Sequence, residues 1–407
     1  MASPADTADV RRHNTSLVLR QVAEAGVSSR ADIRRATGLV SGSVTSIVAD
    51  LLSRGLLVEP GDLVSTRGRP QRVVGLNSRR VVGLVATVVP GAVELEVTDL
   101  SGQPRWSRRR TYDERAHGSS ALLTTLAEGL DEAWDAAAAD RNAYVLGTVL
   151  IVPGTVAADS VMTDSIDLGL RNIDFQAELA PLLRYPHCLS VFNDGRLGAL
   201  AEYQALPPAV SPHVMAYVFS GPLGVGGGLV LDNQLFRGQH GLAGEVGHVV
   251  VDKDGPECAC GARGCLTLYL GTVALAGRVF GMPPEPSAAG EASRLLVAKA
   301  NAGDERTLAV LADAGDALAS AVSTMSHLTD LGAVVLGGDL ALFRDWLLEP
   351  VNALAVSRAR VNPRFWPKVE AARFGDRSPQ TGAWLTLRER VLANPRVVPP
   401  MTAYTPR

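Results

Sequence analysis

The feature that most constrains this fold is a change of sequence pattern near residue 80. From there onward, short runs rich in valine, leucine and isoleucine alternate with helical stretches, and glycines follow many of the runs. Because a parallel strand needs a crossover, usually a helix, before its neighbour, this alternation predicts an α/β fold. At 407 residues the chain also exceeds one ordinary core, so we expect more than one domain.

The elements of this larger part are predicted from periodicity. We expect a β-hairpin over 81–103, a strand, a turn and a helix over 187–203, and two strands around a glycine-rich turn over 214–236. Further helices are expected at 120–140, 291–331 and 380–393, and further strands at 145–154 and 333–338.

The first eighty residues follow a different pattern, with three short helices and then two strands. The helices are predicted over 14–26, 29–38 and 41–57, and the strands over 56–59 and 71–77. Ser29 is the expected N-cap of the second helix, with Asp32 near its positive end, and Gly38 marks a tight turn. This order predicts a winged helix-turn-helix, whose third helix enters the major groove of DNA.

DNA contacts are predicted from hydroxyls, arginines and net charge. Small hydroxyls that can bond phosphates or base edges open the third helix, at Ser41, Ser43, Thr45 and Ser46. Arg67 and Arg69 flank a glycine between the two strands, and an arginine there can enter a narrow minor groove. Residues 1–80 hold 12 arginines, no lysine and 7 acidic residues, a net charge of +5 against −8 for the remaining 327 residues. A polyanion partner fits this asymmetry. The alternatives are ordinary solvated arginines and a helical module that binds protein.

Three of the four cysteines lie within eight residues, at Cys258, Cys260 and Cys265, and His248 precedes them by ten residues. Three thiolates and an imidazole form a complete tetrahedral ligand set for Zn²⁺ with no position open to water, which predicts a structural site. Two glycines between the last two cysteines permit the sharp turn that this convergence needs. The alternative is a group of buried free thiols. Cys188 lies in an apolar run and is expected in the core.

Taken in order, these motifs resemble the ROK family (repressors, open reading frames, kinases) along nearly the whole chain. The matching stretches are SRADIRRATGL, RGRP, VPG, NDGRLGALAE, GVGGG, FRGQHGLAGEVGH, CACGARGC and VVLGG. The resemblance implies a two-lobed, actin-like (ribonuclease H-like) sugar-kinase fold behind the winged helix, and it places a zinc site at the same four residues. We therefore expect a DNA-binding domain in 1–80 and a ROK domain in 81–407. The first lobe is expected at about 81–190 with a C-terminal helix at about 380–395, and the second at about 191–379.

The resemblance also implies a sugar site. Asp194 matches the family's catalytic base, Asn193 matches a sugar contact, and Glu245 and His248 match further sugar-binding positions. Gly154 matches the turn that approaches the sugar. Without these neighbours, an Asn-Asp pair after a strand would be an ordinary turn. Since Glu245 and His248 share one short segment, zinc there would order the ligand site and carry out no chemistry itself.

The chain departs from the family pattern where a kinase binds ATP. The family's Asp-x-Gly-Gly-Thr turn corresponds to residues 85–89, VATVV, which lack the carboxylate and both glycines. The second phosphate turn, usually Gly-Thr-Gly, is Pro-Leu-Gly at 222–224, and proline has no N–H donor. Both changes argue against phosphoryl transfer, so Asp194 is expected to be a vestigial base.

Two further departures concern single positions. Thr267 stands where the family commonly has a glutamate, two residues after the last zinc cysteine. One strong acceptor for a sugar hydroxyl is therefore missing. Val40 stands where the third helix usually has its N-cap serine, so Ser41 is expected to take that role.

These observations predict a DNA-binding transcriptional regulator, a repressor of carbohydrate-related genes that a sugar or sugar derivative controls. The expected partners are a double-stranded operator and further copies of the chain, as a homodimer or a dimer of dimers. One alternative is an active ATP-dependent sugar kinase with an appended DNA-binding domain, and another is a DNA-bound protein without a small-molecule ligand. The sequence has neither a secretory signal pattern nor an apolar run of about 18 residues, so we expect a cytoplasmic protein without a membrane span.

Overall fold

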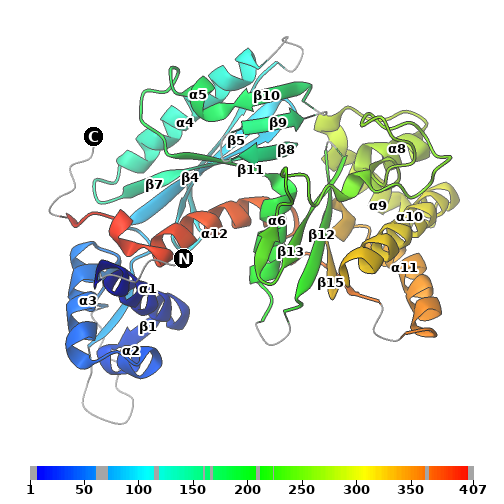
Figure 1. The fold of residues 1–407 in the computed structure, drawn as a ribbon. Coiled ribbons are helices and arrows are strands. Elements are labelled where there is room, and N and C mark those ends of the chain that lie inside the picture. The colour runs from blue at the N-terminus through cyan, green and yellow to red at the C-terminus, as the bar shows by residue number, and fades with distance from the viewer. Residues whose placement is uncertain are drawn as a thin grey trace.

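The computed structural model in Figure 1 has an N-terminal head and two lobes, each lobe built on one five-stranded sheet. It describes residues 7–60, 72–113, 119–158, 161–165, 168–207, 211–222, 224–362 and 366–401. We call the described residues from Thr7 to Leu76 the head. The first lobe contains the sheet around β4, and the second lobe contains the sheet around β12.

The two sheets repeat one topology. Their strand orders are β11-β7-β4-β5-β6 and β14-β13-β12-β15-β16, and each joins three antiparallel strands to two parallel ones. The strands are β4 (Val81–Val89), β5 (Ala92–Asp99), β6 (Pro104–Thr111), β7 (Tyr144–Val152), β11 (Leu189–Asn193), β12 (Val214–Gly221), β13 (Gly224–Leu231), β14 (Gln234–Phe236), β15 (Ala333–Gly338) and β16 (Lys368–Ala371). This is the two-lobed α/β architecture that the resemblance implied.

The apolar run of β4 is continuous because both faces of the strand are buried. Ala86 and Val88 face α4 (Ser120–Ala138), whereas Val85 faces α6 (Asp194–Gln204) and α12 (Ser378–Ala393). The C-terminal helix α12 therefore covers the first sheet, although some 180 residues separate it from that sheet's last strand.

Helix α6 lies between the two lobes (Figure 1). Leu197 packs on the first sheet, whereas Ala199 and Tyr203 pack on the second with Met215 and Tyr217. The opposite face of the second sheet is covered by α8 (Thr272–Phe280), α9 (Ala289–Asn301), α10 (Glu305–Thr329) and α11 (Arg344–Ala359). Helix α6 is thus the element through which the two lobes touch most directly.

Among the described helices, α10 is long and apolar enough to cross a membrane. The bent pair α2 (Arg30–Thr37) and α3 (Ser41–Ser53) meets the same criteria if it is taken as one segment. In α10, 61% of the apolar window is buried inside the protein, which is the position of a core helix.

A small sheet of order β10-β9-β8 follows β7 in the chain. Its strands are β8 (Thr155–Ala158), β9 (Val161–Ser165) and β10 (Leu170–Asp174), and the short helix α5 (Phe175–Leu179) follows them. Met162 and Phe175 are buried in the core of the first lobe. This sheet could not be predicted from the sequence, because its strands are short and of mixed polarity.

The head contains three helices and a three-stranded sheet. The elements are α1 (Thr7–Ala25), β1 (Val27–Ser29), α2 (Arg30–Thr37), α3 (Ser41–Ser53), β2 (Leu57–Val58) and β3 (Val73–Leu76), with the sheet order β1-β3-β2. The predicted cap of the second helix is confirmed, since Ser29 and Asp32 form a reciprocal capping box. Gly38 ends that helix with a φ of 72°, as a tight turn requires.

The boundaries of two head helices differ from the prediction. Helix α1 begins at Thr7 rather than at residue 14, because its first two turns are polar and show no apolar periodicity. The prediction that Ser41 caps the third helix is wrong. Val40 is the N-cap, with an extended φ of −69° and ψ of 151°, and its carbonyl accepts the first helical bond from the Val44 N–H.

Three expectations for the body also differ. The strand and helix of 187–203 join without a turn, because Asn193 ends β11 and Asp194 begins α6. Glycines 226–228 lie inside β13 rather than in a turn. Cys188 is not a core residue, because it precedes β11, is exposed, and accepts a hydrogen bond from Arg390 at 3.5 Å.

Candidate functional site

The structure gathers His248, Cys258, Cys260 and Cys265 into one cluster. Their four ligand atoms all lie within 4.8 Å of one another. The Cys258 Sγ lies 3.7 Å from the His248 Nδ1, and the Cys260 Sγ lies 3.6 Å from the Cys265 Sγ. A tetrahedral ion with bonds of about 2.3 Å to sulfur sets its sulfur ligands about 3.8 Å apart. The cluster therefore has the dimensions of a four-coordinate metal site.

The local backbone explains why these residues converge. Val250 pairs with Cys265 across a short antiparallel bridge, and the Val251 N–H donates to the Gly264 carbonyl at 2.9 Å. Gly264 has a φ of 65°, and a Cβ there would lie only 1.6 Å from the Asp252 carbonyl oxygen. Only glycine fits this position, so it fixes the turn that brings Cys265 back toward His248.

The three thiols of the cluster affect one another's ionisation. Burial raises the pKa of Cys265 to about 12, and its hydrogen bonds with the Cys260 and Cys258 thiols act in the same direction. The Ala262 backbone, by contrast, lowers the pKa of Cys260 by hydrogen bonding. A central divalent cation would stabilise three thiolates that otherwise repel one another.

The second group of candidate residues surrounds the start of α6. Asn193 caps this helix by accepting from the Arg196 N–H at 3.0 Å, and its amide donates to the Gly154 carbonyl at 3.0 Å. The Asp194 carboxylate accepts from the Gly195 N–H at 2.7 Å. Gly154 has a φ of 123°, and a Cβ there would lie 2.5 Å from the Asp164 carbonyl oxygen. The predicted residues of the first lobe therefore form one connected unit.

The segment with Glu245 and His248 reaches the same region across β13. A Cβ on Gly195 would lie 2.3 Å from the Gly227 carbonyl oxygen, and one on Gly244 would lie 3.4 Å from that oxygen. The residues adjacent to Asp194 and Glu245 thus both contact Gly227. The glycine run of β13 serves this close packing, which side chains would prevent.

Glu245 is half-buried, and its carboxylate forms no hydrogen bond or ion pair within the described part of the chain. Burial raises the pKa of its carboxyl group, while Coulombic interaction with His248 and Arg196 opposes that rise. A partly desolvated carboxylate without a donor can accept hydrogen bonds from a polyhydroxylated ligand.

The two expected phosphate positions lie at the β4–β5 hairpin and at the β12–β13 hairpin. Thr87 pairs with Glu94, and Val89 with Ala92, so β4 and β5 form a regular ladder up to the hairpin turn. In the second hairpin, Gly221 pairs with Gly224. Pro222 is exposed between them, whereas position 223 lies outside the described residues. The β4 backbone is therefore paired in the sheet as far as the hairpin turn at Val89 and Ala92.

Thr267, at the departure from the family's glutamate, begins the short helix α7 (Thr267–Leu270). Its Oγ1 accepts from the Val225 N–H at 3.0 Å. The hydroxyl thus occupies a backbone donor next to the second phosphate turn. Thr267 was expected only to weaken sugar binding, but its hydroxyl also accepts from the Val225 N–H beside the expected phosphate turn.

The head places α2 and α3 in helix-turn-helix geometry. Three residues join them, and the helix directions differ by 117°. Ser41, Thr45 and Ser46 are exposed and Ser43 is half-buried, while Val44, Ile47 and Val48 point into the core. No side chain in the described head caps α3, so its first N–H groups face solvent. The predicted wing residues Arg67 and Arg69 lie outside the described residues.

Sequence reasoning missed Arg196, which is 5% exposed. Its guanidinium donates to the Val156 carbonyl of β8 at 2.9 Å and also to the Gly241 carbonyl in the loop before Glu245. One side chain therefore joins the first lobe to the loop that precedes Glu245. The signal in the sequence was an arginine in the first turn of a helix that is rich in small and apolar residues.

Repeated mixed sheets, an interlobe helix and a convergent polar site define the sugar-kinase-like class of α/β proteins. The ROK family model matches residues 93–390, so the chain belongs to the ROK family. It is 25% identical over 400 residues to a putative xylose repressor from Caldicellulosiruptor sp., an alignment that spans 96% of this chain and 98% of that protein.

Two solved structures share the fold to different extents. A ROK family transcriptional regulator, a homologue of the E. coli MLC protein, aligns over 97% of this chain and 100% of its own with a TM-score of 0.74 at 22% identity. The ROK hexokinase from Thermus thermophilus aligns over 76% of this chain and 98% of its own, with a TM-score of 0.58 at 25% identity. The regulator thus matches nearly the whole chain, whereas the kinase leaves about a quarter of it unmatched.

Proposed function

We propose that this protein is a sugar-responsive transcriptional repressor. The observation that carries the proposal is the pairing of two features in one chain: a three-helix head in which α2 and α3 meet at 117°, and a ROK body in which hydrogen bonds join Asn193 to Gly154 and Asp194 at the start of α6. A relative named as a xylose repressor matches over both parts. D-xylose or a related pentose is therefore the first effector to test, and the regulated genes are those of carbohydrate metabolism.

In this proposal, residues 1–80 form a winged helix that binds operator DNA. The exposed hydroxyls of Ser41, Thr45 and Ser46 and the uncapped start of α3 supply donors to phosphates and base edges. Ser43 lies on the same turn, and Arg67 and Arg69 supply charge from the wing. Two heads in a homodimer, or in a dimer of dimers, would bind two half-sites of one operator.

The four-residue cluster holds a structural Zn²⁺ in this proposal. Its three sulfurs and one imidazole nitrogen match the donor set and the spacing that zinc prefers. The metal would fix the 245–248 segment against the following loop, and so would orient Glu245 in the effector site. His248 would act through the metal, while Asn193, Asp194, Glu245 and the Gly154 turn would bind the sugar.

The same proposal assigns no phosphoryl transfer to the body, and Asp194 becomes a ligand contact. The regular β4–β5 ladder and the bond from the Val225 N–H to Thr267 support this assignment, because they use backbone groups near the phosphate positions. The alternative, an ATP-dependent sugar kinase with an appended DNA-binding domain, is favoured by the likeness to the Thermus hexokinase. Release of ADP from ATP, Mg²⁺ and D-xylose would favour that alternative.

The test of the proposed function is binding to fragments of the host genome by the full chain. We expect the protein to retain specific promoter fragments in a gel, and D-xylose or another sugar of a panel to change their affinity several-fold. The double variant Arg67→Ala with Arg69→Ala should weaken binding and reduce its salt dependence. Failure to retain any fragment, with or without sugars, would contradict the repressor assignment.

A further inference from the structure

The strongest unexplained feature is the set of contacts at both ends of α12. At the body end, Glu202 of α6 is 3% exposed. Its carboxylate accepts from the backbone N–H groups of Arg373 at 2.7 Å and Phe374 at 3.0 Å, and from the Ser378 hydroxyl at 2.6 Å. A buried carboxylate with three donors holds its partners firmly. Helix α6 therefore fixes the position at which α12 begins.

Contact between α6 and α12 continues along their backbones. A Cβ on Gly382 would lie 2.0 Å from the Leu197 carbonyl oxygen, so no side chain separates the helices there. Leu197, Ala383 and Leu387 also share one buried cluster with the first sheet. Because close-packed cores resist sliding, a displacement of α6 would displace α12 as well.

The other end of α12 belongs to the core of the head. Val391 and Leu392, together with Val398 beyond the helix, are buried in the same cluster as Leu19 and Val48. The apolar core of the head is therefore incomplete without the C-terminal residues.

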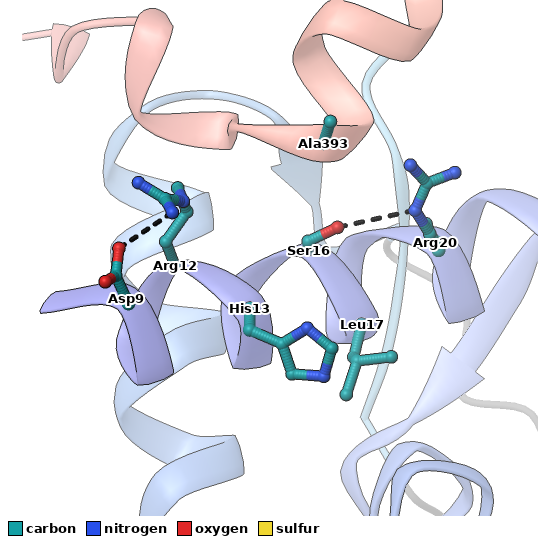
Figure 2. Close-up of a pocket in the computed structure, with 7 residues that line it drawn as sticks. All are labelled: Asp9, Arg12, His13, Ser16, Leu17, Arg20 and Ala393. Atoms are coloured by element: carbon teal, nitrogen blue, oxygen red, sulfur yellow. Dashed lines mark hydrogen bonds and ion pairs between the residues drawn. The ribbon is translucent and has the colours of Figure 1, made fainter. Parts of the chain in front are cut away.

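Polar contacts reinforce this joint. Arg20 of α1 forms a two-pronged ion pair with Glu389, with one nitrogen–oxygen distance of 2.9 Å. Arg54, just after α3, donates to the Val398 carbonyl at 2.7 Å. Figure 2 shows Arg12, Ser16 and Arg20 on the side of α1 that faces Ala393 at the end of α12, where they line a shallow pocket.

Helix α12 can link these two ends as one rigid element. Its 16 residues span about 24 Å at 1.5 Å per residue. Figure 1 shows it running from the head, across the first sheet, to α6. Helix α6 itself begins at Asp194, in the site to which the proposed function assigns the effector.

We propose that Glu202 and Glu389 are positioning residues that make the head follow the movement of α6, through α12. Glu202 couples α6 to the start of α12, and Glu389 couples the end of α12 to α1. This inference rests on the proposed function only for the claim that an effector moves α6. The mechanical link from α6 to α1 is independent of that claim.

The exposure of the second joint shapes the test. The side chains of Arg20 and Glu389 are 35% and 52% exposed, and exposed pairs add little to overall stability. Replacing Glu389 should therefore leave the fold intact and change mainly how tightly α1 is held. Local amide exchange measures this property, whereas global unfolding does not.

Hydrogen–deuterium exchange of the full chain, without DNA or sugar, tests the link. We expect Glu202→Gln to accelerate exchange about fivefold in residues 7–25, as well as in 378–393, although the hydrogen bonds of the Glu202 carboxylate reach no residue of the head. The matched control is Glu128→Gln, which removes an exposed carboxylate paired with Arg110 in the first lobe. It should leave residues 7–25 unchanged. Faster exchange confined to 371–385 in Glu202→Gln would overturn the proposal.

A charge exchange tests the second joint even if Glu202→Gln does not fold. We expect Glu389→Arg alone to accelerate exchange in α1, and the double variant Arg20→Glu with Glu389→Arg to restore it. If the single variant leaves α1 unchanged, or the double variant exchanges as fast as the single one, Glu389 has no positioning role. These results need neither operator nor effector, so they remain distinct from failure of the repressor assignment.

Discussion

The proposed sugar site (Gly154, Asn193, Asp194 and Glu245) and the expected nucleotide side (residues 85–89 and the start of β13) differ in how far their polar groups are already hydrogen-bonded. At the proposed sugar site, the carboxylate of half-buried Glu245 has no hydrogen bond among the described residues, and its segment adjoins the metal-type cluster. On the nucleotide side, the β4 backbone is paired in a ladder, and Thr267 takes up the Val225 N–H. A carboxylate without a donor can accept hydrogen bonds from a ligand, whereas backbone N–H groups that are already bonded cannot donate to one.

The largest effect is expected at the metal-type cluster, which in our proposal orients Glu245 in the sugar site. Cys265→Ser should remove one of four ligands from the centre, abolish zinc retention and lower the free energy of unfolding by about 4 kcal/mol. Metal analysis of the purified chain and thermal melting measure both effects. Cys188→Ser is the matched control, because that cysteine is exposed and outside the cluster. If Cys265→Ser and Cys188→Ser retained equal amounts of zinc, the four-residue cluster would not be the zinc site.

The next effect concerns the acceptors of the sugar side. Asp194→Asn keeps an oxygen for the Gly195 N–H but loses the charge that strengthens bonds to sugar hydroxyls. We expect sugar affinity to fall by about 1.5–3 kcal/mol, which is roughly 10- to 100-fold. Calorimetric titration with D-xylose, or with the sugar of a panel that most raises the melting temperature, measures it. Asp232→Asn, at an exposed hairpin position with a φ of 47°, is the control and should bind like the wild type.

The smallest effect is expected at Thr267, where stability and sugar affinity should respond differently to one substitution. Thr267→Val preserves the shape of the side chain but leaves the Val225 N–H without its acceptor, which should cost about 1 kcal/mol of stability. Sugar affinity should stay within twofold, because this hydroxyl is directed at the backbone. If sugar affinity fell tenfold and stability did not change, Thr267 would be a sugar contact, and its proposed role as an acceptor for the Val225 N–H would be wrong.

The head offers a second comparison, between elements that are locally encoded and elements that are not. The capping box of Ser29 and Asp32 and the turn at Gly38 followed the sequence closely, because each depends on residues within a few positions. The start of α3 did not follow it. Val40 took the N-cap position through its backbone conformation alone, and no serine side chain caps the helix in the described head.

The sequence by itself determined the alternation of strands and helices, the helices of the head and the gathering of three cysteines and a histidine. These features depend on periodicity and short spacing, which act over a few residues. Tertiary structure alone decided that Gly195 and Gly244 meet at Gly227, that Thr267 bonds the Val225 N–H, and that the C-terminal Val391 completes the core of the head. The physical reason is that such contacts join residues distant in the chain, and only the packing of whole elements sets which of them meet.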